Sequence, residues 1–320
     1  MKKIISFFFL VCFLFGIVLI YSCKKDPVIP TLTTTDPTNI TINSVTTGGV
    51  ITKDGGKEIT AYGVCWSTTN NPIVSDSHTL DGTGTGSFIS NLTALLPGTT
   101  YYIRAYATNS AGTAYGNEVI FNTNVADVDG NTYKTVTLGT QVWMAENLKT
   151  TKYFNGNPIP TTISDISREI SPKYQWAYGN DESNVPVYGR LYSWYTVTDS
   201  RNICPTGWHV PTDLEWETLK SYLGGELIAG GKLKETGTAH WQSPNTGATN
   251  ETGFSALPDG YRNYSSFVSI QITGYFWSIS QDLSVPTQGL GQSMRWDNSI
   301  LLKGGYIKPS GCSVRCLRNL

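Results

Sequence analysis

The stretch GWHVPTDLEWETL, residues 207–219, decides where the main helix of this chain begins. Thr212 can accept a hydrogen bond from the first backbone N–H groups of a helix, and Glu215, three residues later, can bond the N–H of the cap itself. Apolar residues then recur with helical spacing and form one apolar face: Trp216, Leu219 and Leu223. The stretch therefore predicts a helix over residues 213–223.

The N-terminus has the composition of an export signal over residues 1–22. Lys2 and Lys3 precede a long apolar run, and the small residue Ser22 precedes Cys23. This arrangement resembles a bacterial lipoprotein signal, which implies that Cys23 is lipidated and becomes the first residue of the mature chain. The alternative is an uncleaved signal anchor, because the apolar run approaches membrane-spanning length. Either way, we expect attachment to a membrane of the cell envelope, with the outer membrane favoured and its periplasmic or outer face left open.

Composition places the rest of the chain among exported, turn-rich β proteins. Removal of the signal leaves 320 − 22 = 298 residues, enough for two domains. Loss of Lys2 and Lys3 changes the charge to 21 − 24 = −3, and no basic patch of the kind that binds nucleic acid is present. Only 15% of residues are charged. We expect a linker over 23–31 and domains over 32–124 and 125–320.

The first domain is predicted to be a β-sandwich. In residues 101–107 alternate side chains are apolar, which is typical of a strand with one packed face. The segment Leu95–Tyr101 resembles the corner of a fibronectin type III domain in which a tyrosine hydroxyl bonds the upstream backbone. That resemblance assigns the core tryptophan to Trp66 and extends over roughly 90 residues, the size of such a domain. We expect this domain to act as a spacer.

Residues 125–320 differ in character, since they contain eight of the nine tryptophans. Residues 132–138 and 141–144 are predicted to form a hairpin closed by Gly139-Thr140. Residues 226–235 are compatible with a second helix despite Gly230-Gly231. The remainder predicts short strands joined by long loops.

Six blocks run in order over nearly all of this region: DVDGNTYKTV (127–136), QVWMAENL (141–148), YGRLYSWY (188–195), CPTGWHVPTDLEW (204–216), ETGFSALPDGYR (251–262) and SVRCLR (313–318). Together they resemble the Fibrobacter succinogenes major paralogous domain. That family is similar to the C-type-lectin-like fold of formylglycine-generating enzymes. The resemblance implies an α+β domain with irregular sheets and one or two helices.

Of the six cysteines, Cys12 and Cys23 lie at the N-terminus, which leaves four and allows three full pairings. An oxidising compartment favours a disulfide, and we expect Cys204 to pair with Cys316. Cys65 is then a small buried hydrophobe, and Cys312 is the odd cysteine.

No residue is assigned a catalytic role. The resemblance to formylglycine-generating oxidases leaves that activity as an alternative, and Cys312 with Cys316 could hold Cu(I) if both sulfurs were free. Their spacing does not match the copper pair of those enzymes. His209 has no visible partner to orient it and is interpreted as structural. No cofactor or metal is expected, although loop carbonyls and carboxylates could hold a structural calcium ion.

Aromatic residues supply the strongest functional indication, because their flat faces pack against sugar rings and protein partners. The candidates cluster after residue 240: Trp241, Tyr261, Tyr264, Tyr275 and Trp277. We therefore expect non-catalytic recognition or adhesion to a glycan or an envelope protein. A purely structural role in the envelope is the third alternative.

Overall fold

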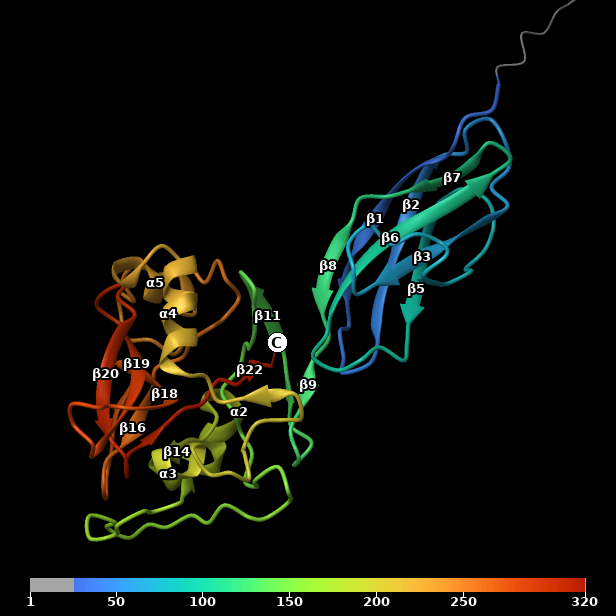
Figure 1. Cartoon of the computed structure of the whole chain (residues 1–320). Helices are drawn as coiled ribbons and strands as arrows, with labels where there is room; N and C mark the ends of the chain where they lie inside the picture. Colours follow the sequence, from blue (N-terminus) through green and yellow to red (C-terminus); the bar gives the residue numbers. More distant parts are fainter. Residues whose placement is uncertain (1–25, 320) are drawn as a thin grey trace, which may run out of the picture.

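The computed structural model describes residues 26–319, so the predicted signal and the lipidation site Cys23 lie outside the described residues. Strands dominate, and Figure 1 shows β1–β8 gathered in one body and β9–β22 in another. We call these bodies the sandwich (residues 31–122) and the head (residues 125–319). Among residues 26–319, no helix is long and apolar enough to cross a membrane. The boundary at 124/125 stays a prediction.

The sandwich consists of two antiparallel sheets. One has the strand order β1-β2-β5, and the other has the order β4-β3-β6-β7 with β8 also paired to β6. The strands are β1 (Thr31–Thr38), β2 (Val45–Lys53), β3 (Ala61–Ser67), β4 (Ser77–His78), β5 (Gly86–Leu92), β6 (Thr100–Asn109), β7 (Gly112–Tyr115) and β8 (Val119–Asn122). Their apolar faces meet in one core between the sheets.

The predicted features of the sandwich are largely confirmed. Strand β6 alternates as expected, with Tyr101 and Ile103 facing the core. The hydroxyl of Tyr101 accepts a hydrogen bond from the N–H of Leu96 at 3.0 Å, which is the tyrosine corner. Cys65 is fully buried with a free thiol. The assignment of Trp66 to the core is wrong in part, because this side chain lies near the end of β3 and is only half-buried.

The head contains three β-sheets. A short one joins β9 to β10, a four-stranded sheet has the order β11-β12-β22-β15, and the largest sheet has the order β13-β14-β21-β16-β18-β19-β20 with β17 paired to β16. Its strands are β9 (Val125–Ala126), β10 (Thr132–Tyr133), β11 (Thr135–Leu138), β12 (Gln141–Met144), β13 (Gln175–Trp176), β14 (Leu191–Ser193), β15 (Trp208–His209), β16 (Asp259–Arg262), β17 (Phe267–Ile270), β18 (Thr273–Gln281), β19 (Gln288–Arg295), β20 (Leu302–Ile307), β21 (Gly311–Cys312) and β22 (Leu317–Arg318). The predicted hairpin is confirmed, since Leu138 pairs with Gln141.

The helices of the head are short. Four are α-helices and two are 3₁₀ turns: α2 (Val185–Tyr188), α3 (Trp194–Val197), α4 (Asp213–Tyr222), α5 (Glu226–Leu233), η1 (Tyr178–Asn180) and η2 (Glu182–Asn184). The predicted capping box opens α4, with the N–H of Glu215 donating to Thr212 Oγ1 at 3.2 Å and the N–H of Thr212 donating to Glu215 Oε2 at 2.7 Å. The second predicted helix is α5.

Two glycines in α5 allow another segment to approach its backbone. A Cβ at Gly230 would lie 2.3 Å from the carbonyl oxygen of Ile300, and one at Gly231 would lie 2.4 Å from that of Gly247. The N–H of Gly231 also donates to the carbonyl of Ser299 at 3.0 Å. Close packing with the chain before β20 therefore outweighs the poor helix propensity of glycine.

The sandwich and the head touch directly. The guanidinium of Arg318 donates to the carbonyl of Gly98 at 2.8 Å. In the short connection between the two bodies, the carbonyl of Thr123 accepts a hydrogen bond from the hydroxyl of Thr135 in the head at 3.1 Å. A Cβ at Gly98 would lie 2.8 Å from the indole of Trp208. The turn before β6 can therefore pack against the head only because Gly98 has no side chain.

We predict that Gly230→Ala destabilises the head, although this change normally stabilises a helix by about 0.5–1 kcal/mol. The added methyl group would meet the Ile300 carbonyl, and overpacking of this kind costs about 1–3 kcal/mol. Urea unfolding followed by tryptophan fluorescence measures the change. The exposed helical Ser221→Ala serves as the control and should be neutral or stabilising. An unchanged or increased stability of Gly230→Ala would contradict the packing argument.

Candidate functional site

A buried arginine joins distant segments in the core of the head. Arg315 has 0% of its surface exposed. Its guanidinium donates to the carbonyls of Met144 at 3.2 Å, Phe254 at 2.6 Å and Ser255 at 3.0 Å, and to Asn147 Oδ1. Burial lowers the pKa of Arg315 to about 9. The side chain therefore remains charged at neutral pH while it holds three parts of the chain together.

Asp259 is the acidic partner of this network. Its Oδ2 accepts from Asn147 Nδ2 at 2.7 Å, and its Oδ1 accepts from the N–H of Tyr275 at 3.0 Å. Burial raises the pKa of Asp259 to about 7, against the effect of its hydrogen bonds and of Arg315. Asp259 begins β16 and Tyr275 lies in β18. The network therefore fixes the relative position of the two strands that carry Tyr261 and Tyr275.

These two tyrosines open onto a pocket of about 230 Å³ together with Tyr306 of β20. The ring centroids of Tyr261 and Tyr275 are 5.0 Å apart, and those of Tyr275 and Tyr306 are 5.4 Å apart at an interplanar angle of 88°. The remaining lining has one aliphatic residue, Ile307, and four that are polar or small: Asn263, Gln288, Gly305 and Ser310. We call this site the tyrosine pocket. It combines aromatic faces with amide and hydroxyl groups, which can bind a ligand and orient it.

The structure brings together only part of the predicted aromatic site. Tyr261 and Tyr275 line the pocket. Tyr264 does not line it, and its ring instead packs against the buried group formed by Ile166, Trp176 and Leu191. Its carbonyl accepts a hydrogen bond from the guanidinium of Arg262 at 2.9 Å. Tyr264 therefore stabilises the β16–β17 turn.

The predictions for Trp241 and Trp277 are wrong because both indoles lie in the core, with 1% and 0% of their surface exposed. Each ring N–H donates to a backbone carbonyl, Trp241 to Ala256 at 3.0 Å and Trp277 to Tyr192 at 2.6 Å. Both side chains are fully used inside the protein and cannot present a face to a ligand.

The sequence argument missed Tyr306, Gln288 and Ser310. Tyr306 is an aromatic residue after residue 240, so the rule that selected the other candidates also covers it. Its position beside Tyr275 depends on strand order, because β19 pairs with both β18 and β20. No local pattern marks Gln288 or Ser310.

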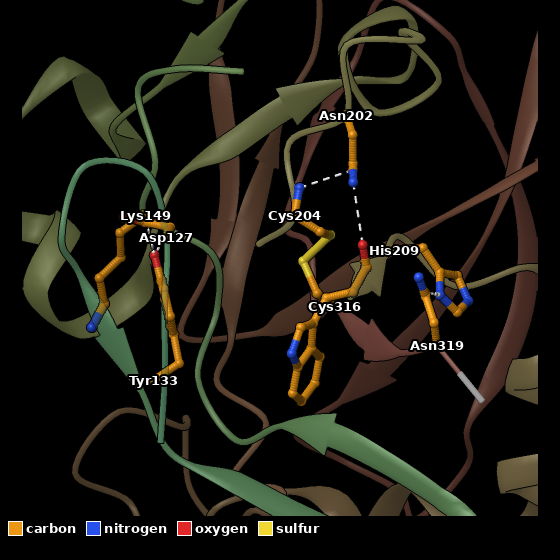
Figure 2. The surroundings of a disulfide bond; sticks show 9 residues. Asp127, Tyr133, Lys149, Asn202, Cys204, His209, Cys316 and Asn319 are labelled. Atoms are coloured by element: carbon orange, nitrogen blue, oxygen red, sulfur yellow. Dashed lines mark hydrogen bonds between the residues drawn. A yellow bond between two sulfur atoms is a disulfide. The ribbon is translucent and has the colours of Figure 1, made fainter. Parts of the chain in front are cut away.

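The predicted disulfide between Cys204 and Cys316 is confirmed, with a Cα–Cα distance of 6.0 Å (Figure 2). Asn202 supports the bridge: its Oδ1 accepts from the N–H of Cys204 at 2.9 Å, and its Nδ2 donates to the carbonyl of Trp208 at 3.2 Å. Cys312 is free and buried. Because the sulfur of Cys316 is already bonded, the pair considered for copper does not exist in this state.

His209 has two partners that sequence reasoning did not identify. Its Nε2 lies 2.9 Å from Glu215 Oε1. Its Nδ1 lies 2.6 Å from Asn319 Oδ1, and these two side chains face each other in Figure 2. Glu215 is the partner of Thr212 in the capping box of α4. Burial raises the pKa of Glu215, but the hydrogen bonds from Thr212 and the contact with His209 outweigh burial and leave this pKa lowered. Both ring nitrogens of His209 are thus occupied in linking the helix start to the C-terminus.

The carboxylates of Asp127 and Asp129, at the start of the head, are used in contacts within the protein. Asp127 Oδ1 accepts from the N–H groups of Asp129 and Asn131 at 2.9 and 3.0 Å. Asp129 pairs with Lys152 at 2.8 Å. Within residues 26–319, no group of three or more His, Cys, Asp or Glu side chains is placed to hold a metal ion. The expectation of a structural calcium ion stays a prediction.

Comparison with known proteins gives a match to the Fibrobacter succinogenes major domain over residues 136–318, more than half of the chain. No curated protein sequence matches it. Solved structures similar to the N-terminal part include the sensor domain of the anti-sigma factor RsgI4 of Pseudobacteroides cellulosolvens, with 16% identity, 30% of this chain and 95% of that chain covered, and a TM-score of 0.24. The fourth fibronectin type III domain of a human protein has 21% identity, 35% and 90% coverage, and a TM-score of 0.26.

We predict that Arg315→Met destabilises the head by about 3–5 kcal/mol, because several buried carbonyls lose their donor and Asp259 loses the nearby positive charge. The double variant Arg315→Met with Asp259→Asn should recover part of this loss, since it removes the uncompensated charge. Urea unfolding monitored by tryptophan fluorescence measures both. A loss below about 1 kcal/mol, the scale of an exposed ion pair, would show that Arg315 does not support the core.

Proposed function

The chain belongs to the Fibrobacter succinogenes major domain family, and we propose that it is a non-catalytic recognition protein that binds a glycan or a protein partner at the cell envelope. The tyrosine pocket carries this proposal. Aromatic faces and hydrogen-bonding groups converge there on strands that a buried network fixes in place. Rigid positioning of this kind favours binding because little conformational freedom is lost when a ligand enters.

The chemistry of the pocket supports binding more than catalysis. Its lining has three phenols, two amides and one hydroxyl, with no acidic or basic side chain to transfer protons at neutral pH. Burial raises the pKa values of Tyr261 and Tyr306, so these phenols stay protonated. The oxidase alternative would need two free sulfurs, whereas Cys316 is bonded to Cys204.

We place the protein on a bacterial membrane, anchored through a lipid at Cys23, with the outer membrane favoured. In this arrangement the sandwich acts as a spacer between the lipid and the head, and the contact between Arg318 and Gly98 limits the freedom of the joint. The proposal that the head is C-type-lectin-like rests on two helices beside irregular sheets. An experimental structure that superimposes on no C-type lectin domain would contradict it.

Binding is tested with the chain from residue 23 onward on a glycan array and against envelope extract. We expect saturable binding that is lost in Tyr261→Ala with Tyr275→Ala, because this change removes two aromatic walls while the buried network remains. Tyr222→Ala, which changes a tyrosine that is 61% exposed on α4, is the control. The absence of any saturable binding would instead favour a structural role in the envelope.

Lipid attachment has a separate test. Cys23→Ala should abolish acylation and move the protein from the membrane fraction to the soluble fraction, because the lipid is then the only anchor. Fractionation and metabolic labelling with a fatty acid measure the two effects. Continued tight membrane association without label would identify the N-terminal segment as a signal anchor.

A further inference from the structure

We propose that the outer edge of β20 is a self-association surface. The β20 strand of a second copy of this chain adds to it antiparallel, with Gly305 of one copy opposite Gly305 of the other. Self-association of this kind requires no ligand and is independent of the recognition function above.

Strand β20 is the last strand of the largest sheet of the head, and within residues 26–319 it pairs only with β19. It has six residues. The other outermost strands of this sheet and of the four-stranded sheet have two to four: β13, β17, β11 and β15. Figure 1 shows β20 on the side of the head that faces away from the sandwich. A second copy can therefore approach this edge without meeting the sandwich.

Every second residue of β20 directs its backbone groups away from β19. Both backbone groups of Gln288, in β19, bond the β18–β19 turn, at 2.8 and 3.1 Å, so they do not bond the paired residue Ile307. Bonded and non-bonded pairs alternate along an antiparallel ladder. The backbone groups of Lys303, Gly305 and Ile307 therefore point outward. Of these groups, only the carbonyl of Ile307 has a backbone partner within residues 26–319, the N–H of Ser310 at 2.9 Å.

The edge lacks most of the features that keep edge strands from pairing with other chains, which are charges, prolines and bulges. Strand β20 contains no proline, and its pairing with β19 shows no register shift. Its one charged side chain, Lys303, is held by Asp213 Oδ2 at 2.6 Å. Gly304 and Gly305 carry no side chain in the middle of the strand, and Gly305 is exposed. Another backbone can therefore come within hydrogen-bond distance.

A second copy fits this edge best in one register. With Gly305 on a two-fold axis, Lys303 of each copy lies opposite Ile307 of the other, and each pair of outward residues can exchange two backbone hydrogen bonds. An axis at Lys303 would place two ammonium groups directly opposite each other, which is unfavourable. An axis at Ile307 would leave Lys303 and Gly305 without a partner strand, because β20 ends at residue 307.

An acidic side chain also lies near the proposed axis. Asp282 Oδ2 is 3.1 Å from the position that a Cβ on Gly305 would occupy. The hydrogen bond to Asp213 raises the pKa of Lys303, and the nearby charges of Asp213, Glu217 and Asp282 add to this effect. Lys303 is therefore close to Asp282 in the same copy, so each copy brings its own counter-charge to the axis.

Pairing would also bring two tyrosine pockets together. Gly305, Tyr306 and Ile307 line the pocket, and the same residues lie at the proposed axis. If the pocket binds a ligand as proposed above, a ligand with repeated units could contact both copies, which raises its apparent affinity without any new contact.

Sedimentation velocity measures the self-association. The chain from residue 24 onward contains every described residue and omits Cys23, whose thiol could join two chains covalently. Over about a hundred-fold range of protein concentration we expect a reversible monomer–dimer equilibrium. Gly305→Pro should weaken the dimer at least about ten-fold, because it removes the central outward N–H while the bonds to β19 remain. Near-UV circular dichroism and the thermal midpoint check that this variant stays folded.

Amide hydrogen exchange followed by NMR locates the surface residue by residue. The N–H groups of Gly304 and Tyr306 bond β19 and should exchange slowly at every protein concentration. The N–H groups of Lys303, Gly305 and Ile307 should exchange fast in dilute solution and slowly when the dimer is populated.

Two substitutions at one position test the register. Ile307→Glu and Ile307→Lys remove the same side chain, and in the proposed register each new charge lies opposite Lys303. The Glu variant should associate about ten-fold more tightly than the Lys variant, because opposite charges attract across paired strands and the pair occurs twice in the dimer. Since the chain is net negative, non-specific repulsion would give the reverse order.

Three results would overturn the proposal: a chain that stays monomeric at every concentration, a dimer that a folded Gly305→Pro leaves as tight as before, or equal association of the two Ile307 variants. If Gly305→Pro does not fold, the Ile307 variants and the exchange pattern decide. Failure of self-association leaves the proposed ligand binding intact, because Tyr261→Ala with Tyr275→Ala tests that function separately.

Discussion

The head depends on the burial of one charged group, the guanidinium of Arg315. A charge is tolerated inside a protein only when hydrogen bonds and an opposite charge compensate it. Here the compensation comes from the carbonyls of Met144 and Phe254 and from the side chain of Asn147, with Asp259 in the same network. Three blocks that carry the family resemblance therefore meet at one point: 141–148, 251–262 and 313–318.

The same constraint connects the core with the candidate binding site. Asp259 lies in the network around the Arg315 guanidinium, and its carboxylate also accepts a hydrogen bond from the N–H of Tyr275. The group that helps to accommodate a buried charge therefore also sets the position of β16 relative to β18. The disulfide from Cys316 to Cys204 fastens the strand end beyond Arg315 to the segment before α4. A pocket on such a frame is largely preformed, which suits recognition of a small ligand with few contacts.

Local features of the chain were predictable because their physical causes lie within a few residues. The capping box of Thr212 and Glu215 and the corner at Tyr101 each depend on groups at most five positions apart. The site was only half predictable. Tyr261 and Trp277 are both aromatic residues on paired strands, β16 and β18, and only the packing of these strands decides that one faces a pocket while the other is enclosed.

The sequence by itself determined the start of α4, the tyrosine corner, the β11–β12 hairpin and the family, since these follow from short-range spacing and from recognisable blocks of residues. Tertiary structure alone decided which polar groups are paired. It gave His209 two partners and placed Tyr306 beside Tyr275 across β19. Hydrogen bonding and burial of a side chain depend on residues that are distant along the chain, and only the assembled sheets bring those residues together.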